Sequence, residues 1–133
     1  MKRVSKKQRG FTLIELMVVV AIIGILAGVV VGQYRHQIQK SKEAVLKENL
    51  FRTRNAIGQY FADKGSYPFD LQALVDDQYL RALPRDPITG STDTWITIPA
   101  DMGEMDISQE PGISDIQSGA NGSSNDGSPY SSW

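Results

Sequence analysis

The chain has no cysteine among its 133 residues, and its single histidine is His36. The absence of cysteine excludes disulfide bonds, cysteine-ligated zinc and thiol catalysis. One histidine supplies neither a metal cluster nor a nucleophile–base pair, so we interpret it as an interfacial polar residue. There is also no glycine-rich phosphate-binding loop. We therefore expect no enzymatic activity, no catalytic residue and no required cofactor.

Positive charge is missing from the C-terminal part of the chain. No Lys or Arg follows Arg85, whereas five basic residues precede residue 10. The region after Arg85 holds eight acidic residues: Asp86, Asp93, Asp101, Glu104, Asp106, Glu110, Asp115 and Asp126. This asymmetry argues against nucleic acid as a partner. It favours a basic N-terminus kept in the cytoplasm and an acidic end located elsewhere.

Residues 11–34 form a long apolar run in which Glu15 is the one charged side chain. As a helix, 24 residues span ~36 Å at ~1.5 Å per residue, enough to cross a hydrocarbon core of ~30 Å. A cleaved secretory signal fits less well, because its apolar region is commonly ~7–15 residues and ends in an A-x-A-like site. The run predicts a single membrane-spanning helix in contact with lipid.

Three glycines recur at every fourth position within this run: Gly24, Gly28 and Gly32. Small residues on one helix face allow membrane helices to approach closely, although glycine is also simply common in such helices. Each glycine lowers helix propensity by roughly 1 kcal/mol relative to alanine in water. This segment is thus a candidate for both helix packing and local stretching.

Residues 35–64 continue the helix with an amphipathic pattern, which Gly65 is expected to end as a C-cap. One stripe is predicted to seat a small globular head: Leu46, Leu50, Thr53, Ile57 and Phe61. The charged residues on the other faces are interpreted as solvated: Lys40, Lys42, Glu43, Lys47, Glu48, Arg52 and Arg54.

The head is expected over residues 65–133. A short helix capped by Asp70 reaches about Tyr79, and residues 83–90 form a proline-rich loop. Residues 94–98 read as a strand, with further strands at Ile107 and at 113–116. The predicted fold class is α+β: one long N-terminal helix and a head with a short helix and a small antiparallel sheet. Trp133 is expected to pack back on that head.

The segment Arg9-Gly10-Phe11-Thr12-Leu13-Ile14-Glu15-Leu16, behind its basic leader, resembles the signal of type IV pilins and type II secretion pseudopilins. The resemblance implies that a prepilin peptidase removes residues 1–10, cutting after Gly10, and methylates the new N-terminal Phe11. It also implies that Glu15 pairs with the N-terminal amine of a neighbouring subunit. An ion pair shielded from water is stronger than an exposed one, and an unpaired carboxylate there is costly.

Many members of these families carry a helix-kinking proline at the position of Gly32, so a fixed kink is not expected here. The head motifs resemble the major pseudopilins of type II secretion systems: Gly65-Ser66-Tyr67-Pro68, Leu83-Pro84-Arg85-Asp86-Pro87, residues 115–122 and Ser132-Trp133. That resemblance implies calcium in the C-terminal loop, with candidate ligands Asp115, Ser118, Asn121 and Asp126. Asn121 stands where members often have aspartate, and a flexible loop without metal is the alternative.

The resemblance implies a structural subunit that polymerises from the bacterial inner membrane into a periplasmic pseudopilus and drives export of folded proteins. Its expected partners are further copies of the chain, the prepilin peptidase, the assembly platform and minor pseudopilins. The N-terminus would be cytoplasmic and the head periplasmic. The first alternative is a type IV pilin of a surface fibre for adhesion, motility or DNA uptake. A monomeric, membrane-tethered binding module is the second.

Overall fold

The structure is a computed structural model that describes residues 10, 12–101 and 110–133. The predicted roles of Phe11 and the predicted strand at Ile107 lie outside the described residues. The elements in chain order are α1 (Leu13–Lys64), α2 (Leu71–Asp76), β1 (Ile96–Pro99), β2 (Ile113–Gln117) and the 3-10 helix η1 (Tyr130–Ser132). This confirms the α+β fold class, with one long N-terminal helix. The chain divides into two compact units, residues 1–38 and 39–133.

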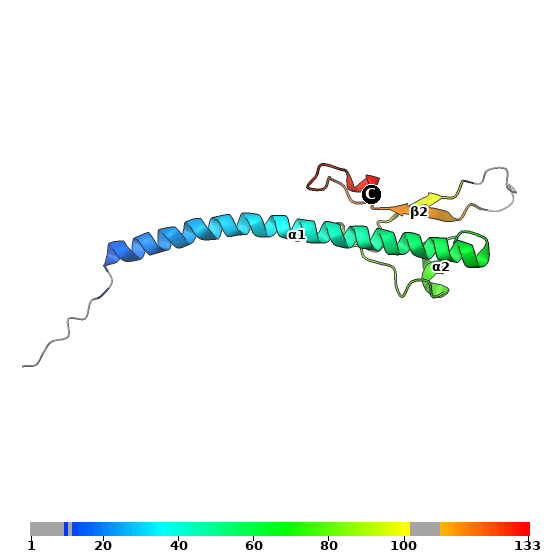
Figure 1. Ribbon diagram of the computed structural model, residues 1–133, viewed down its shortest axis with the longest axis horizontal. Helices are drawn as coiled ribbons and strands as arrows, with labels where there is room; N and C mark the ends of the chain where they lie inside the picture. The colour runs from blue at the N-terminus through cyan, green and yellow to red at the C-terminus, as the bar shows by residue number, and fades with distance from the viewer. Residues whose placement is uncertain (1–9, 11, 102–109) are drawn as a thin grey trace, which may run out of the picture. The chain divides into compact units, whose positions relative to one another are not determined.

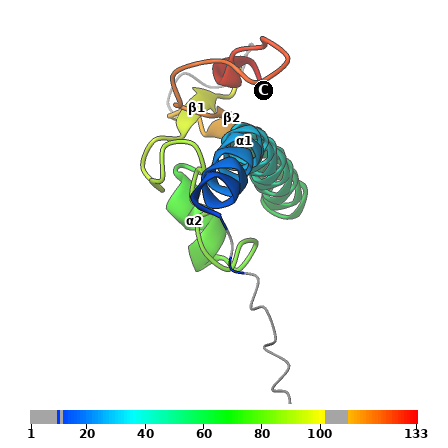
Figure 2. The ribbon, with the colours of Figure 1, turned by 90° about the vertical axis from the view of Figure 1, so that its left-hand side faces the viewer.

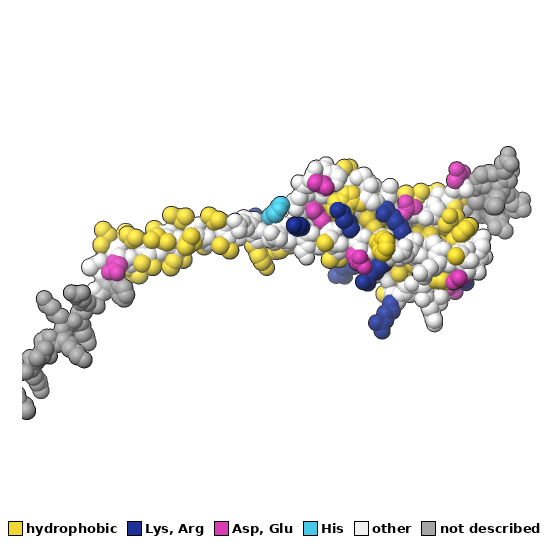
Figure 3. Space-filling model, in the orientation of Figure 1, with side chains coloured by type: hydrophobic (Ala, Val, Ile, Leu, Met, Phe, Trp, Pro, Cys, Tyr) yellow, Lys and Arg dark blue, Asp and Glu magenta, His cyan; other side chains and the backbone are white. Residues whose placement is uncertain are grey.

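The described part of the first unit is the apolar half of α1. Its side chains are exposed on all faces, and hydrophobic groups cover its surface in Figure 3. By length and composition α1 is the one described helix able to cross a membrane. A helix that is apolar all round must be covered by lipid or by other helices.

The second unit contains the amphipathic half of α1, whose inward face is buried as the stripe predicts. Leu46, Leu50, Thr53 and Ile57 are buried, and Ala56 joins them. The prediction is wrong for Phe61, which is 42% exposed. It lies at one edge of the stripe and stacks on Tyr67, with ring centroids 4.4 Å apart.

Gly65 ends α1 as predicted. Its φ of +71° lies in the left-handed region, and its N–H donates to the carbonyl of Phe61 at 2.8 Å. This is the αL capping motif, for which glycine is suited because it has no Cβ.

Helix α2 begins as predicted but ends three residues earlier than expected. The Asp70 carboxylate accepts the N–H of Ala73 at 2.8 Å, so Asp70 is the N-cap. At the other end Gln78 takes φ +65°, and the N–H of Tyr79 donates to Leu74 O at 2.8 Å. This Schellman motif turns the chain away before Tyr79. The local sequence does not predict this turn, because the left-handed position is glutamine rather than glycine.

Strands β1 and β2 pair antiparallel, with Ile96 opposite Gln117 and a register shift between Ile98 and Pro99. The predicted strand at 113–116 is confirmed. The predicted strand at 94–98 is observed at Ile96–Pro99, so it begins two residues later and ends one residue later than expected. Trp95 lies outside the ladder because its indole is buried and its Nε1–H donates to Pro84 O at 2.9 Å.

Within the second unit, the sheet and α2 flank α1. The strands and the C-terminal segment lie on one side of the helix and α2 on the other, in both views (Figures 1 and 2). The core joins all of these elements through ten buried hydrophobic residues: Leu46, Leu50, Ala56, Ile57, Leu74, Trp95, Ile113, Ile116, Ala120 and Tyr130.

Close packing also requires glycine at position 119. A Cβ on Gly119 would lie 2.0 Å from the carbonyl oxygen of Thr94, so no larger residue fits without moving the backbone.

Candidate functional site

The predicted processing site lies just before α1. Gly10 is exposed, and an added Cβ there would meet nothing within 4 Å. The helix begins at Leu13, three residues beyond Gly10. A peptide bond after Gly10 would therefore lie outside the helical hydrogen-bond ladder.

Glu15 occupies the third position of α1, and Thr12 precedes the helix. The Thr12 Oγ1 accepts the N–H of Glu15 at 3.3 Å, and Thr12 O accepts the N–H of Leu16 at 3.2 Å. Thr-x-x-Glu is the capping-box spacing, and a carboxylate in the first turn is favoured by the helix dipole. Glu15 therefore has a local reason for its position in addition to the predicted docking role.

The three predicted packing glycines lie in α1 with open space around them. Added Cβ atoms at Gly24, Gly28 and Gly32 would meet nothing within 4 Å. All three are helical, so the segment is not unwound in the single chain.

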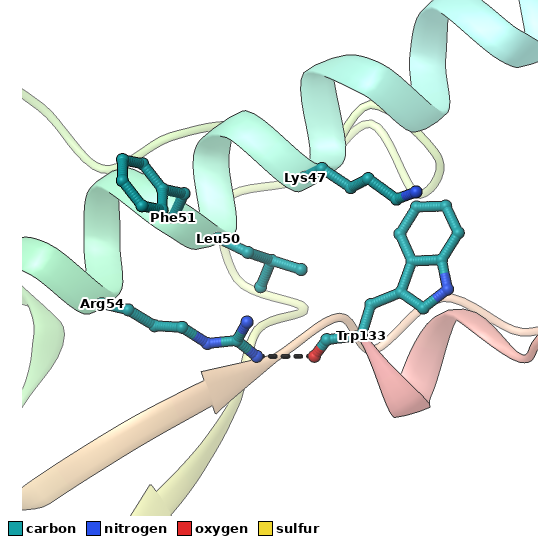
Figure 4. Close-up of a pocket in the computed structure, with 5 residues that line it drawn as sticks. All are labelled: Lys47, Leu50, Phe51, Arg54 and Trp133. Atoms are coloured by element: carbon teal, nitrogen blue, oxygen red, sulfur yellow. Dashed lines mark hydrogen bonds between the residues drawn. The ribbon is translucent and has the colours of Figure 1, made fainter.

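Arg54 ties α1 to β2 and to the end of the chain. Its Nε–H donates to Asp115 Oδ1 at 2.7 Å. Its Nη2 donates to two main-chain oxygens, Ile116 O at 2.9 Å and Trp133 O at 2.5 Å. Figure 4 shows the bond to Trp133. The interpretation of Arg54 as a solvated position is wrong, because one guanidinium holds three separate points of the head.

Glu43 holds the C-terminal loop, and the interpretation of this residue as solvated is also wrong. Its Oε1 accepts the Tyr130 hydroxyl at 2.9 Å and the N–H of Asn125 at 3.1 Å. The Tyr130 hydroxyl in turn accepts a hydrogen bond from the Gln39 side chain. Desolvation, and then the nearby Glu43 carboxylate, raise the pKa of Tyr130.

Trp133 packs back on the head, as predicted. Its ring meets Tyr130 edge-on at 5.2 Å, and its Nε1–H donates to Ser128 Oγ at 2.9 Å. Lys47 Nζ lies 4.5 Å from the centroid of the indole. Together with Arg54 and Glu43, these contacts fasten the last ten residues to α1.

The four predicted calcium ligands do not share one set of contacts. Asp115 pairs with Arg54, and the buried Ser118 hydroxyl donates to the buried Asp86 carboxylate at 2.6 Å. Asp86 also accepts the N–H groups of Ile88 and Thr89, which folds the proline-rich loop.

The other two candidate ligands lie in the loop itself. Asp126 accepts hydrogen bonds from the Ser124 and Ser128 hydroxyls, which lower its pKa, while Asn121 is exposed. Among residues 10, 12–101 and 110–133, no three His, Cys, Asp or Glu side chains form a metal-binding group. Calcium also binds main-chain carbonyl and amide oxygens, so calcium binding stays a prediction.

Sequence reasoning missed the residues that hold the C-terminal loop: Gln39, Glu43, Arg54 and Tyr130. On a helical projection the first three lie among charged and polar positions that usually face solvent. They acquire partners only because residues 115–133 pack against α1, and no local sequence pattern predicts that packing.

A long helix, apolar in its first half and packed under a small α+β head in its second, defines the type IV pilin-like class of subunit. Residues 5–31 match the model of the prokaryotic N-terminal methylation motif. The chain is 34% identical over 118 residues to the type II secretion system core protein G of Klebsiella michiganensis, covering 77% of this chain and 82% of that one. It belongs to the type II secretion system core protein G family.

Two further relatives show the range of similarity. The type II secretion system core protein G of Pseudomonas aeruginosa is 39% identical over 98 residues, covering 62% of this chain and 69% of the relative. The fimbrial protein EcpC of Eikenella corrodens is 31% identical over 126 residues, covering 91% and 78%. No solved structure gives a significant match to the chain.

Proposed function

We propose that this protein is the major structural subunit of a type II secretion pseudopilus, which polymerises from the inner membrane and drives export of folded proteins. The family membership carries this proposal, since core protein G relatives cover most of both chains. The subunit performs no chemistry of its own, and the energy for assembly comes from other components.

We propose that maturation precedes assembly. The basic leader stays in the cytoplasm, the prepilin peptidase cuts after Gly10, and Phe11 becomes the methylated N-terminus. The match to the methylation motif supports this step. The apolar half of α1 then lies in the inner membrane as a single span, with the head in the periplasm.

Glu15 is the proposed docking residue for the amine of a neighbouring Phe11. In the single chain it receives the Thr12 cap but makes no salt bridge among the described residues. A carboxylate within an apolar run is costly until a cation arrives, so pairing favours one axial register between subunits. The open faces at Gly24, Gly28 and Gly32 allow neighbouring helices to approach closely.

Protein groups bond the C-terminal loop in the single chain. Asp126 is bonded within the loop and Glu43 holds it from α1. Calcium, which the resemblance implies, would use Asn121 and Asp126 with main-chain carbonyls. Asp115 and Ser118 could join them only by leaving Arg54 and Asp86.

Replacement of Glu15 tests the docking role. In a host that carries the assembly machinery, Glu15→Ala should still be cut and inserted, but filament yield should fall by roughly tenfold or more, since a desolvated charge contact often exceeds ~1.4 kcal/mol. Glu48→Ala is a matched control, because Glu48 is a surface glutamate of α1 outside the apolar half. Processed, inserted Glu15→Ala that forms filaments at the normal yield would remove the docking role.

A type IV pilin of a surface fibre is the second candidate. It is favoured by the fimbrial relative, whose alignment covers 91% of this chain. The absence of a C-terminal cysteine pair and the small head favour the pseudopilin. The secretion phenotype of a deletion strain separates the two.

A further inference from the structure

The head carries an open groove beside the C-terminal segment. It has a volume of about 420 Å³ and is lined by Lys47, Leu50, Phe51, Arg54 and Trp133. Figure 4 shows Lys47 and Arg54 extending from α1 toward Trp133 at the end of the chain, with Leu50 between them and Phe51 at the edge of the groove. Phe51 is 62% exposed although it is a large apolar residue. The groove thus has an apolar floor and a cationic rim.

The charge on the rim is only partly neutralised. Arg54 is paired with Asp115, but Lys47 has no salt bridge within the described residues and contacts the indole face instead. In Figure 3, Lys and Arg side chains gather around hydrophobic surface on this part of the molecule. An occupant that suits such a groove has an apolar side chain with carboxylates next to it.

Phe69 has these properties. At 70% it is the most exposed large hydrophobic residue described in the second unit. Asp70 follows it directly, Asp76 is the last residue of α2, and both are exposed. We define Phe69 with these two carboxylates as the knob.

The knob is held rigidly by its neighbours. Pro68 is buried and its carbonyl accepts the N–H of Ile113 at 2.8 Å, while Asp70 caps α2. Phe69 is thus an exposed ring on a fixed backbone. A pre-ordered anchor loses less conformational entropy when it binds than a mobile one does.

Knob and groove lie on different sides of the same unit. Phe69 immediately precedes α2, which lies across α1 from the C-terminal segment that borders the groove (Figures 1 and 2). One chain therefore cannot fill its own groove with its own knob. A contact between two different surfaces of identical subunits is heterologous, and it produces an open helical polymer when it does not close into a ring.

We propose that Phe69 of one subunit inserts into the Lys47–Phe51–Trp133 groove of another copy. The heads of neighbouring subunits then form a second contact along the filament, in addition to the contact between their helices. This inference rests on the proposed polymeric function and adds a specific interface to it. Asp70 and Asp76 face the cationic rim, and the two phenylalanine rings remove each other from water.

The absence of cysteine allows a direct cross-linking test in the full-length chain. The double variant Asp70→Cys/Lys47→Cys, which keeps Phe69 and Phe51, is assembled in the secretion host, and the sheared filaments are oxidised. The proposal predicts a ladder of dimers, trimers and longer species, because every subunit supplies one knob and one groove. The matched control is Asp70→Cys/Arg52→Cys, since Arg52 is exposed on α1 and does not line the groove. The control should stay monomeric.

Three results would overturn the contact. The subunits of test-pair filaments could remain uncross-linked after oxidation, the test and control pairs could give equal ladders, or the test pair could give dimers only. The parent chain distinguishes this failure from failure of the proposed function. Normal parent filaments without the specific ladder refute only the contact. A parent that forms no filament at all under these conditions refutes the polymeric function, and the contact with it.

Alanine variants decide the matter if the cysteine pair does not assemble. Phe69→Ala and Phe51→Ala should each lower filament yield by roughly tenfold, as removal of an interface anchor commonly does, without lowering the melting temperature of the detergent-solubilised chain. Val45→Ala, an exposed apolar position outside the groove, should leave the yield unchanged. Normal filaments with impaired secretion from Phe69→Ala would assign the knob to another partner and overturn the proposal.

Discussion

Replacement of Arg54 by methionine should release the C-terminal segment from α1. Methionine keeps much of the aliphatic volume but removes the hydrogen bonds to Asp115, Ile116 O and Trp133 O. The side chains of Arg54 and Asp115 are 37% and 42% exposed, so the ion pair itself contributes at most about 1 kcal/mol. The two main-chain acceptors add about 0.5–1.5 kcal/mol each.

The sum is a loss of about 1–4 kcal/mol in the free energy of unfolding, with a midpoint of about 2.5 kcal/mol. For a unit of this size, 1 kcal/mol shifts the melting temperature by roughly 4–8 °C, so we expect a fall of roughly 10–20 °C. Both tryptophans, Trp95 and Trp133, lie in the second unit, so fluorescence of the full-length chain in detergent reports its unfolding.

Arg52→Met is the matched control. Arg52 pairs with Glu48 on the same helix, but these side chains are 69% and 55% exposed. Such an i,i+4 surface pair contributes about 0.3–0.5 kcal/mol, so the melting temperature should fall by only a few degrees. Equal shifts for the two variants would refute the role assigned to Arg54. Asp115→Asn should also be non-additive with Arg54→Met, because the two residues share one contact.

Three further perturbations test other parts of the structure. Gly119→Ala should destabilise the head by about 3 kcal/mol or more, because its Cβ would lie 2.0 Å from Thr94 O. In the control Gly58→Ala, the added Cβ meets nothing within 4 Å, and this variant should stabilise α1 by about 0.5–1 kcal/mol. Similar shifts in melting temperature for the two variants would contradict the packing argument. Gln78→Gly should raise the melting temperature by several degrees by relieving the positive φ of +65°, and an unchanged or lower value would speak against the Schellman motif. The hydroxyls of Ser124 and Ser128 lower the pKa of Asp126 below its ordinary value of 3.8. The ionised Asp126 carboxylate therefore stabilises the fold fully above pH 3.8, and this stabilisation is lost as the pH falls through the lower pKa of the folded state. Melting temperatures measured from pH 6 to pH 2 should fall in the parent chain and fall less in Asp126→Asn. Identical pH profiles for the two proteins would exclude a stabilising role of the Asp126 carboxylate. Calcium binding is tested in the same assay: a calcium-dependent rise in the melting temperature would show that the loop rearranges into a metal site, and an unchanged value after treatment with chelator would favour the loop held by protein groups alone.

The elements with strong local signals could be predicted from the sequence. The apolar run and the amphipathic stripe predicted α1 to within two residues at its start, and Gly65 and Asp70 marked a helix end and a helix start. These signals are local because capping and periodicity depend on a few neighbouring residues. The docking role of Glu15 came from the resemblance, and the structure adds the Thr12 cap.

The parts that failed depend on contacts distant in sequence. Trp95 has a strand-forming side chain, but its hydrogen bond to Pro84 O keeps it outside the ladder. Arg54 and Glu43 have the pattern of surface charges and acquire partners only when residues 115–133 return to α1. The end of α2 at Gln78 lacked the glycine that usually marks such a turn. Single-sequence patterns carry no information on these tertiary choices.

The most direct test of the proposed function is deletion of the gene in its host, with restoration by the parent chain and by Glu15→Ala. Secreted proteins are then compared between the medium and the periplasm. The pseudopilus account predicts that normally exported proteins accumulate in the periplasm of the deletion strain and of the Glu15→Ala strain, and that the parent chain restores export. Unchanged export, with loss of surface fibres, twitching or DNA uptake, would contradict it and identify the protein as a type IV pilin.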